Sequence, residues 1–383
     1  MANSRRAAAF AVAKWLATGE FASSLLPDCP DRAFVQDVVY TVMRRLRPLR
    51  RILGGFLAKW PKGELEALLY VGAAQILYMP DVPDFAAVNE TVEAAKSCEG
   101  KSIPKVVNGV LRNLLRKRDE VDLGTELGTF PRAIANRWTT RYGKDAAERL
   151  ASWHNQPAET FLAYKDGRFQ ALERGRKVAE VPGYADGDFV VQDPGTAVSV
   201  SLLDPKAGER VLDACAAPGG KTAQIAWRGA SVTACEVNPR RRARLAENLK
   251  RLGVAAEVAS SFEEVSRRCA SEGFLFDKIL VDAPCSNTGV FRRRPDARWN
   301  WNVAKLKSLV ALQAEILDAA LPLLAPGGTL VYSTCSNEPE ENGDQAAAFL
   351  ARHKDLSMVA SKEALPHECG HDGVFAAAFK RKI

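Results

Sequence analysis

The stretch Leu212-Asp213-Ala214-Cys215-Ala216-Ala217-Pro218-Gly219-Gly220-Lys221-Thr222 decides how the second half of this 383-residue chain folds. It places an acidic residue after an apolar run, then a glycine turn, then a helical segment. Glycines at such a turn let the backbone approach a ligand closely. A Walker A loop needs a glycine where this chain has Cys215, and no GxGxxG is present, which argues against a nucleoside triphosphatase and against a dinucleotide fingerprint.

Around this stretch, apolar runs alternate with helical segments from about residue 195 onward. The strand candidates are residues 210–214, 232–237, 256–259, 278–282 and 329–333, and the helical candidates are residues 222–227, 240–252, 262–269 and 304–324. This alternation predicts a doubly wound, Rossmann-like α/β domain with a parallel sheet covered on both faces. Ligands bind such sheets beyond the carboxyl ends of the strands, where Asp213, Glu236, Asp282 and Cys335 are expected.

Glu236 ends the second strand, about twenty residues after the glycine turn. A carboxylate at that position can accept both hydroxyl groups of a ribose. The turn and the acid together suit an adenosyl cofactor that has no pyrophosphate, and S-adenosylmethionine fits. The alternative is a tight structural turn with a solvated glutamate.

Two further strand ends carry thiols, Cys285 in Asp282-Ala283-Pro284-Cys285-Ser286 and Cys335 in Tyr332-Ser333-Thr334-Cys335-Ser336. C5 of cytosine is a poor nucleophile, but a thiolate that adds to C6 activates it toward a methyl donor. The ring nitrogen N3 then needs a proton donor, and Asp282 could serve if burial raises its pKa. The alternative is that both cysteines are small buried residues. The Asn/Asp-Pro-Pro-aromatic signature of amine methyltransferases is absent, which favours carbon as the methyl acceptor.

The first 120 residues carry apolar residues at helical spacing, in residues 7–16, 34–53, 65–77 and 106–115. We therefore expect three parts: an all-helical domain over residues 1–125, a mixed accessory region over 126–194 and the α/β domain over 195–383. Short strands are expected at residues 161–164 and 189–192.

The amino-acid composition limits the classes of protein to which this chain can belong. The chain is 47% hydrophobic and 26% charged, as is typical of a soluble globular protein. No apolar run approaches the roughly 18 residues of a membrane span, and the basic N-terminus reads as an amphipathic helix rather than a signal peptide. Eight cysteines without a CxxC pair argue against a metal site and for free thiols in a reducing compartment. We expect a cytoplasmic monomer with no membrane partner.

The net charge of +7 favours an anionic partner, and nucleic acid is the natural candidate. Arg292, Arg293 and Arg294 precede Trp299, so arginines could hold phosphates while an aromatic ring stacks on an unpaired base. A second basic cluster lies at residues 44–51. Ordinary basic drift and solvated helix faces are the alternatives. The target base would have to leave its stack to reach a pocket at the sheet edge.

Several blocks match one family together: residues 213–222, 282–289, 294–299, 313–317, 327–336, 340–342 and 371–375. They resemble the Nop/Sun family of RNA 5-methylcytosine methyltransferases, and most of all its RsmB-type branch. Residues 88–96 and 107–112 resemble the NusB-like helical domain that this branch carries at its N-terminus. The resemblance implies methylation of cytosine C5 in RNA, with small-subunit ribosomal RNA as the substrate.

The resemblance also implies residue roles. Cys335 corresponds to the nucleophile and Cys285 to the thiol that helps release the product, whereas the residues alone would have favoured Cys285 as nucleophile. Asp282 contacts the cofactor end or the target base. The positions that hold S-adenosylmethionine in the family are here Cys215, Ala216, Ala217, Pro218, Gly219, Gly220, Lys221, Glu236, Arg241 and Ser260.

The chain departs from the family pattern at several of these positions. Glu236 replaces an aspartate, and Ser260 and Ser261 stand where an aspartate usually holds the adenine amine, although serine still hydrogen-bonds, more weakly. Asn287 replaces a glycine, and residues 162–165 replace Leu-Arg-x-Asn. Two alternatives therefore stay open: the same chemistry on transfer RNA, and a non-catalytic RNA-binding assembly or antitermination factor.

Overall fold

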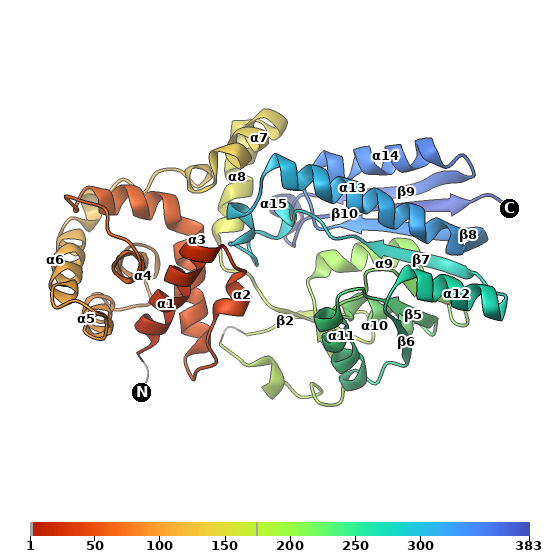
Figure 1. The fold of residues 1–383 in the computed structure, drawn as a ribbon, viewed down its shortest axis with the longest axis horizontal. Helices are drawn as coiled ribbons and strands as arrows, with labels where there is room; N and C mark the ends of the chain where they lie inside the picture. The colour runs from red at the N-terminus through yellow and green to blue at the C-terminus, as the bar shows by residue number, and fades with distance from the viewer. Residues whose placement is uncertain (1–2, 174) are drawn as a thin grey trace. The chain divides into compact units, whose positions relative to one another are not determined.

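The computed structural model describes residues 3–173 and 175–383, and the chain forms two units (Figure 1). Unit 1 comprises Met1–Pro157 together with Phe291–Trp301, and unit 2 comprises Ala158–Val290 and Asn302–Ile383. These boundaries differ from the expected ones at residues 125 and 194. Residues 126–157 and 291–301 belong to unit 1 with the helices, and residues 158–194 belong to unit 2. No helix in the described residues is long and apolar enough to span a membrane.

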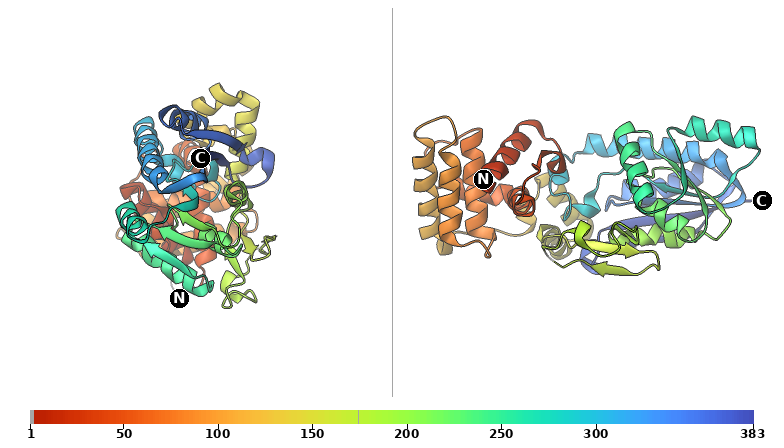
Figure 2. Two further views of the ribbon diagram at one scale, coloured as in Figure 1. Left: turned by 90° about the vertical axis from the view of Figure 1, so that its right-hand side faces the viewer. Right: turned by 90° about the horizontal axis from the view of Figure 1, so that it is seen from below.

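Unit 1 is helical, as expected. Its helices are α1 (Ser4–Thr18), α2 (Ala22–Leu25), α3 (Arg32–Gly54), α4 (Glu64–Tyr78), α5 (Asp84–Ala95), α6 (Ile103–Arg116), α7 (Arg132–Tyr142) and α8 (Lys144–Asn155). Helix α4 is buried nearly all round, and α4, α5 and α6 lie side by side (Figure 2). Gly72 permits this approach, because a Cβ there would lie 2.3 Å from Leu111 Cδ1.

Unit 2 is built on a seven-stranded sheet. Its strands are β4 (Arg210–Asp213), β5 (Ser231–Cys235), β6 (Ala256–Ala259), β7 (Phe276–Asp282), β8 (Leu324–Thr334), β9 (Leu356–Ala364) and β10 (Val374–Arg381), in the order β6-β5-β4-β7-β8-β10-β9. The five expected strands are confirmed and are parallel to one another. The sheet is mixed rather than wholly parallel, because β10 runs antiparallel to both β8 and β9.

Helices cover both faces of this sheet. They are α9 (Ala197–Leu203), α10 (Gly220–Ala226), α11 (Pro239–Arg251), α12 (Phe262–Glu272), α13 (Val303–Ala320), α14 (Gly343–Arg352) and α15 (Pro366–Cys369). Along β8, Leu330 and Tyr332 enter one core while Val331 enters the core on the opposite face. This alternation follows the two-residue period of a strand. Because both faces are apolar, the polar side chains gather at the strand ends.

A small antiparallel sheet precedes the large one. It contains β1 (Phe161–Tyr164), β2 (Phe169–Ala171) and β3 (Phe189–Val191), which confirms both short strands expected in this region. The departure at residues 162–165 falls on β1, where Leu162 packs in a small core with Phe189. Beyond β3, Asp193 accepts hydrogen bonds from the backbone of Gly195 and Asp372, which joins this region to the start of β10.

Candidate active site

The turn after β4 brings backbone to the edge of the sheet. Gly219 has φ of 104°, and its N–H donates to Ala216 O at 2.7 Å. A Cβ on Gly219 would lie 2.9 Å from a methyl carbon of Leu245, and one on Gly220 would lie 3.2 Å from the amide of Gln192. The positive φ accounts for glycine at position 219, and the amide of Gln192 leaves little room for a Cβ at position 220. Helix α10 begins at Gly220, so the turn and the first helical N–H groups are held at one place.

Asp213 lies beneath this turn and is 1% exposed. Its Oδ2 accepts the hydroxyl of Thr222 at 2.7 Å, whereas Oδ1 is buried without a hydrogen-bond partner among the described residues. Burial raises the pKa of Asp213 to about 6, against the opposing effect of the Thr222 hydrogen bond. An unpartnered carboxylate oxygen at the sheet edge is a place where a cationic or donating ligand group would be accepted.

Asp213→Asn is expected to stabilise the protein above pH 6 and to change little at pH 4. The pKa of the folded carboxyl, about 6, lies above its ordinary value of 3.8. The stability that this group contributes is therefore fully present below pH 4 and is lost as the pH rises through 6, a change of about 3 kcal/mol at most. Asparagine imitates the protonated carboxyl at every pH. Melting temperatures of both proteins, compared between pH 4 and pH 8, should diverge with rising pH; a constant difference would contradict this.

Lys221 and Asp282 form an ion pair at the end of β7. Lys221 Nζ lies 2.5 Å from Asp282 Oδ2, and the hydroxyl of Ser333 donates to Asp282 Oδ1 at 2.8 Å. Burial lowers the pKa of Lys221, but the charge of Asp282 and its hydrogen bond outweigh burial and raise it. Asp282 thus accepts on both oxygens, and this geometry gives no support to the neutral, proton-donating Asp282 considered from the sequence.

Glu236 and Arg241 pair with each other, and Arg241 reaches the glycine turn. Glu236 is 4% exposed, and its oxygens accept the N–H of Asn238 at 2.9 Å and pair with Arg241 Nε at 3.3 Å. Arg241 also donates to Ala217 O at 3.1 Å. A buried carboxylate fixed in this way has a defined direction, which is what recognition of two neighbouring hydroxyl groups requires.

Ser260, at the end of β6, makes a contact that the sequence analysis missed. Its N–H and hydroxyl both donate to Glu264, at 2.8 and 2.5 Å, and these bonds lower the pKa of Glu264. Ser261 caps α12 by accepting the N–H of Glu264 at 3.2 Å. The Ser-x-x-Glu spacing of a capping box was the available signal. A carboxylate therefore stands near the position where the family has its aspartate.

The two strand-end thiols are in contact. Cys285 Sγ lies 3.2 Å from Cys335 Sγ, and Cys335 Sγ also donates to Asn287 Oδ1 at 3.3 Å. Cys285 is 8% exposed, while Cys335 is more open. The hydrogen bond with Cys335, then burial, then the charge of Cys335 raise the pKa of Cys285 well above its ordinary value. The structure thus brings the two predicted thiols together, and their contact opposes ionisation of Cys285.

The backbone conformation at position 287 explains why asparagine can stand where the family has glycine. The φ of Asn287 is 61°, in the left-handed region that glycine occupies freely and asparagine tolerates best among the other residues. Its amide donates to Cys285 O at 2.9 Å while its carbonyl accepts from Cys335. The replacement keeps the backbone shape and adds a link between the two thiol-bearing segments.

Some of the residues expected to contact RNA are engaged inside unit 1, and others are exposed. Arg292 is 8% exposed, donates to Pro157 O at 2.9 Å and lies over the ring of Trp153. Trp299 donates to Met43 O at 2.9 Å and packs edge-on against Trp15. By contrast, Arg293 is half-buried and Arg294 is exposed.

The second basic cluster, on α3, is engaged within unit 1. Arg44 is buried and donates to Arg292 O, Arg45 pairs with Glu126, and Arg47 donates to Phe130 O. Arg51 pairs with Asp122, and Arg50 lies over Trp60. These arginines hold other segments of unit 1 against α3, so this cluster acts chiefly as internal support.

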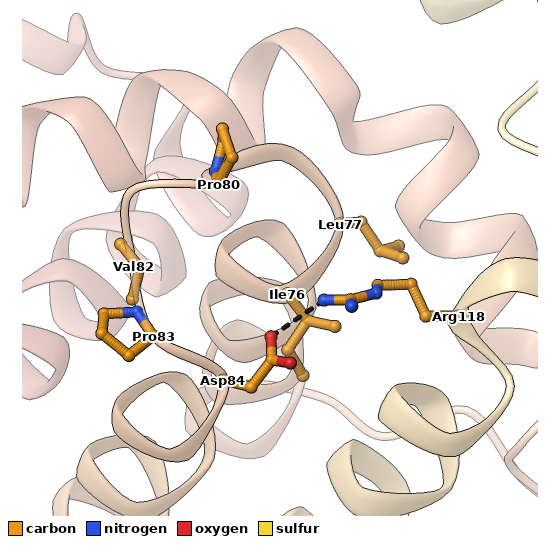
Figure 3. Close-up of a pocket in the computed structure, with 7 residues that line it drawn as sticks. All are labelled: Ile76, Leu77, Pro80, Val82, Pro83, Asp84 and Arg118. Atoms are coloured by element: carbon orange, nitrogen blue, oxygen red, sulfur yellow. Dashed lines mark hydrogen bonds and ion pairs between the residues drawn. The ribbon is translucent and has the colours of Figure 1, made fainter.

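A hollow of about 550 Å³ lies in unit 1, away from any residue singled out by the sequence (Figure 3). It is lined by Ile76, Leu77, Pro80, Val82, Pro83, Asp84 and Arg118. Its two charged residues pair with each other at 2.9 Å. The hollow therefore presents no nucleophile and no unpaired charge, and we assign it no chemistry.

Known proteins resemble this chain over its whole length. The family model "16S rRNA methyltransferase RsmB/F" matches residues 200–380, and the NusB family model matches residues 2–116. The chain is 35% identical to ribosomal RNA small subunit methyltransferase B of Serratia proteamaculans, with 98% of each chain covered. It is 34% identical to the protein of that name from Vibrio cholerae, with 99% of this chain and 98% of the relative covered.

Solved structures show the same fold. The crystal structure of PH0851 superposes with a TM-score of 0.80 at 20% identity, over 99% of this chain and 98% of that one. NSun6 from Pyrococcus horikoshii with SFG superposes with a TM-score of 0.56 at 19% identity, over 66% of this chain and 98% of that one. Both resemblances drawn from the sequence are confirmed: this chain belongs to the RsmB/F family of ribosomal RNA small-subunit methyltransferases and carries a NusB domain at its N-terminus.

Proposed function

We propose that this protein methylates C5 of a cytosine in small-subunit ribosomal RNA, with S-adenosylmethionine as methyl donor and Cys335 as nucleophile. The observation that carries the proposal is the pair of thiols, 3.2 Å apart, at the carboxyl edge of the sheet beside the glycine turn. Two cysteines with a purely structural role would need no charged neighbours, yet Asp282, the last residue of β7, forms an ion pair with Lys221 of α10 beside them.

The reaction begins with the thiolate of Cys335. It adds to C6 of the base, which forms a carbon–sulfur bond and moves electron density onto C5. S-Adenosylmethionine, when bound, supplies the electrophilic methyl group that C5 takes up, and the sulfur–methyl bond breaks to leave S-adenosylhomocysteine. Removal of the C5 proton then re-forms the C5–C6 double bond and expels the Cys335 thiolate.

We propose that Cys285 takes the C5 proton. The hydrogen bond with Cys335, then burial, then the charge of Cys335 raise the pKa of Cys285. Once Cys335 is bonded to C6, it is a neutral thioether, so its hydrogen bond and its charge no longer oppose ionisation of Cys285, while burial still does. Cys285 then ionises more readily and acts as the base that completes release. The two thiols thereby exchange roles within one turnover, in the order that the family implies.

The residues around the glycine turn fit an adenosyl cofactor. Glu236 offers a buried, oriented carboxylate for the ribose hydroxyls, and the turn at Gly219 and Gly220 leaves the backbone open. Ser260 and Glu264 stand at the next strand end, where an adenine amine would need an acceptor. The unpartnered oxygen of Asp213 suits the donating end of the methionine part. We propose Lys221 and Asp282 as contacts to the target base or to the reacting end of the cofactor.

We further propose that unit 1 grips the RNA and that Arg293 and Arg294 contact phosphates. Arg294 is the exposed member of the run, so it is the better candidate for a contact that is sensitive to salt. The enzyme would act as a monomer in the cytoplasm.

The test uses unmodified small-subunit ribosomal RNA, methyl-labelled S-adenosylmethionine and RNA carrying tritium at C5 of cytidine. We expect the labelled nucleoside to be 5-methylcytidine and tritium to be released in equal amount, because the C5 proton must leave. A labelled N4-methylcytidine, or methylation without tritium release, would overturn the proposal. Methylation of transfer RNA in preference to ribosomal RNA would keep the chemistry and change the substrate.

A further inference from the structure

Glu341 is a fully buried carboxylate that lies between the two thiol-bearing strand ends. It closes the short turn Pro339–Glu341 and is 0% exposed. Its Oε1 accepts the N–H of Ser286 at 2.8 Å, and its Oε2 accepts the hydroxyls of Ser286 and Ser336, each at 2.5 Å. Ser286 directly follows Cys285, and Ser336 directly follows Cys335.

We propose that Glu341 is a positioning residue for methyl transfer: its buried carboxylate holds the two thiol-bearing strand ends at one spacing, and its charge opposes ionisation of Cys285. The proposal rests on the proposed function, since it assigns the two thiols different roles in one turnover.

The carboxylate is itself held from other elements. Gln313 of α13 is fully buried and donates to Glu341 Oε1 at 3.1 Å and to Pro284 O at 2.9 Å. The hydroxyl of Tyr332 donates to Glu341 O at 2.6 Å. A carboxylate offers about four acceptor sites and no donor, and here four donors meet it. A buried charge is costly unless it is hydrogen-bonded throughout, so this one can persist only with both strand ends in place.

The charge of Glu341 also acts on the thiols. It is a further cause of the raised pKa of Cys285, after the effects of Cys335 and of burial. The other titratable groups around the thiol pair are Tyr332, whose pKa burial raises well above its ordinary value, and the Lys221–Asp282 ion pair, whose ammonium is influenced by Cys335. Two anions, Glu341 and the Cys335 thiolate, thus oppose ionisation of Cys285.

Glu341→Gln removes the charge and can keep the contacts. The amide oxygen can accept from Ser286 N–H and Gln313, and the amide nitrogen can donate to the two serine hydroxyls, which rotate to accept. Alkylation of Cys285 by iodoacetamide, followed by peptide mass spectrometry across pH, reports its ionisation in the full chain. We expect the profile to move to lower pH by about one unit, so that Cys285 reacts about tenfold faster at pH 8. Glu315→Gln, an exposed change on α13, should leave the profile unchanged.

A second variant separates spacing from charge. Glu341→Asp keeps the charge but shortens the side chain by one carbon. The alkylation profile of Cys285 should therefore stay near that of the parent. We expect kcat for methylation to fall at least tenfold, while KM for RNA stays unchanged. Circular dichroism confirms that both variants fold. An alkylation profile that Glu341→Gln does not move, or full turnover in Glu341→Asp, overturns the positioning role. A parent enzyme that methylates no RNA overturns the proposed function instead, and the alkylation result, which needs no RNA, distinguishes the two failures.

Discussion

Methylation is expected to fall by about 10³-fold or more when Cys335 is replaced by alanine. Without the sulfur–C6 bond, C5 keeps too little electron density to attack the methyl donor, and no neighbouring group can substitute. Cys285 cannot take over, because it is 8% exposed and its pKa is held high by its surroundings. The measurement is methyl incorporation into unmodified small-subunit ribosomal RNA under single-turnover conditions.

Cys285→Ala should give the opposite phenotype. Cys335 can still add to C6 and the methyl group can still be transferred, but the base that removes the C5 proton is missing. A covalent protein–RNA adduct should therefore persist on a denaturing gel, in the presence of S-adenosylmethionine, and should be absent in Cys335→Ala. Cys369→Ala is the matched control, since this partly exposed thiol lies on α15 and takes no part in the mechanism. An adduct in Cys335→Ala but not in Cys285→Ala would make Cys285 the nucleophile and break the proposed order of roles.

The meeting of the strand-end acids and thiols could be predicted because these residues end or follow parallel strands. The carboxyl ends of β4, β7 and β8 meet at one edge, so an acid or a thiol in the last position of any of them must come close to the others. Asp282 pairs in register with Ser333, and the thiols that follow these two strands meet in consequence. The prediction of these sites used the two-residue period of the strands and the order of the strands along the chain, and both can be read from the sequence.

Other features depend on long-range packing and could not be predicted. Glu341 belongs to a block that matches the family, but its residue type and spacing do not predict its burial against Ser286 and Ser336. The packing of residues 291–301 could not be predicted from the sequence either. An arginine beside an aromatic residue is typical of an RNA contact, but also of a cation over a ring inside a protein, and Arg292 over Trp153 is the second kind of contact. Sequence pattern alone does not distinguish the two.

Arg298→Ala is expected to weaken unit 1 locally by about 3 to 5 kcal/mol. Arg298 is 0% exposed, donates to Asn155 Oδ1 at 2.8 Å and to His154 O at 3.1 Å, and lies 4.0 Å from the centre of the Phe130 ring. Burial lowers its pKa well below the ordinary value, which reflects how completely water is excluded. Alanine would remove both hydrogen bonds and leave a cavity the size of an arginine side chain. Segment 291–301 would lose these two hydrogen bonds to the end of α8.

Hydrogen exchange followed by mass spectrometry measures the local loss of stability in each peptide of the chain. Peptides from α8 and from residues 291–301 should exchange roughly 100-fold faster or more in Arg298→Ala, since about 1.4 kcal/mol corresponds to a factor of ten. Peptides from β4, in unit 2, should keep their protection. Arg294→Ala is the matched control, because this exposed arginine of the same run should leave exchange unchanged while lowering RNA affinity. If Arg298→Ala exchanged like the parent, the buried arginine would not hold this segment. If Arg294→Ala loosened it equally, the exposed member of the run would support the fold as well, and its proposed role on RNA would lose its main argument.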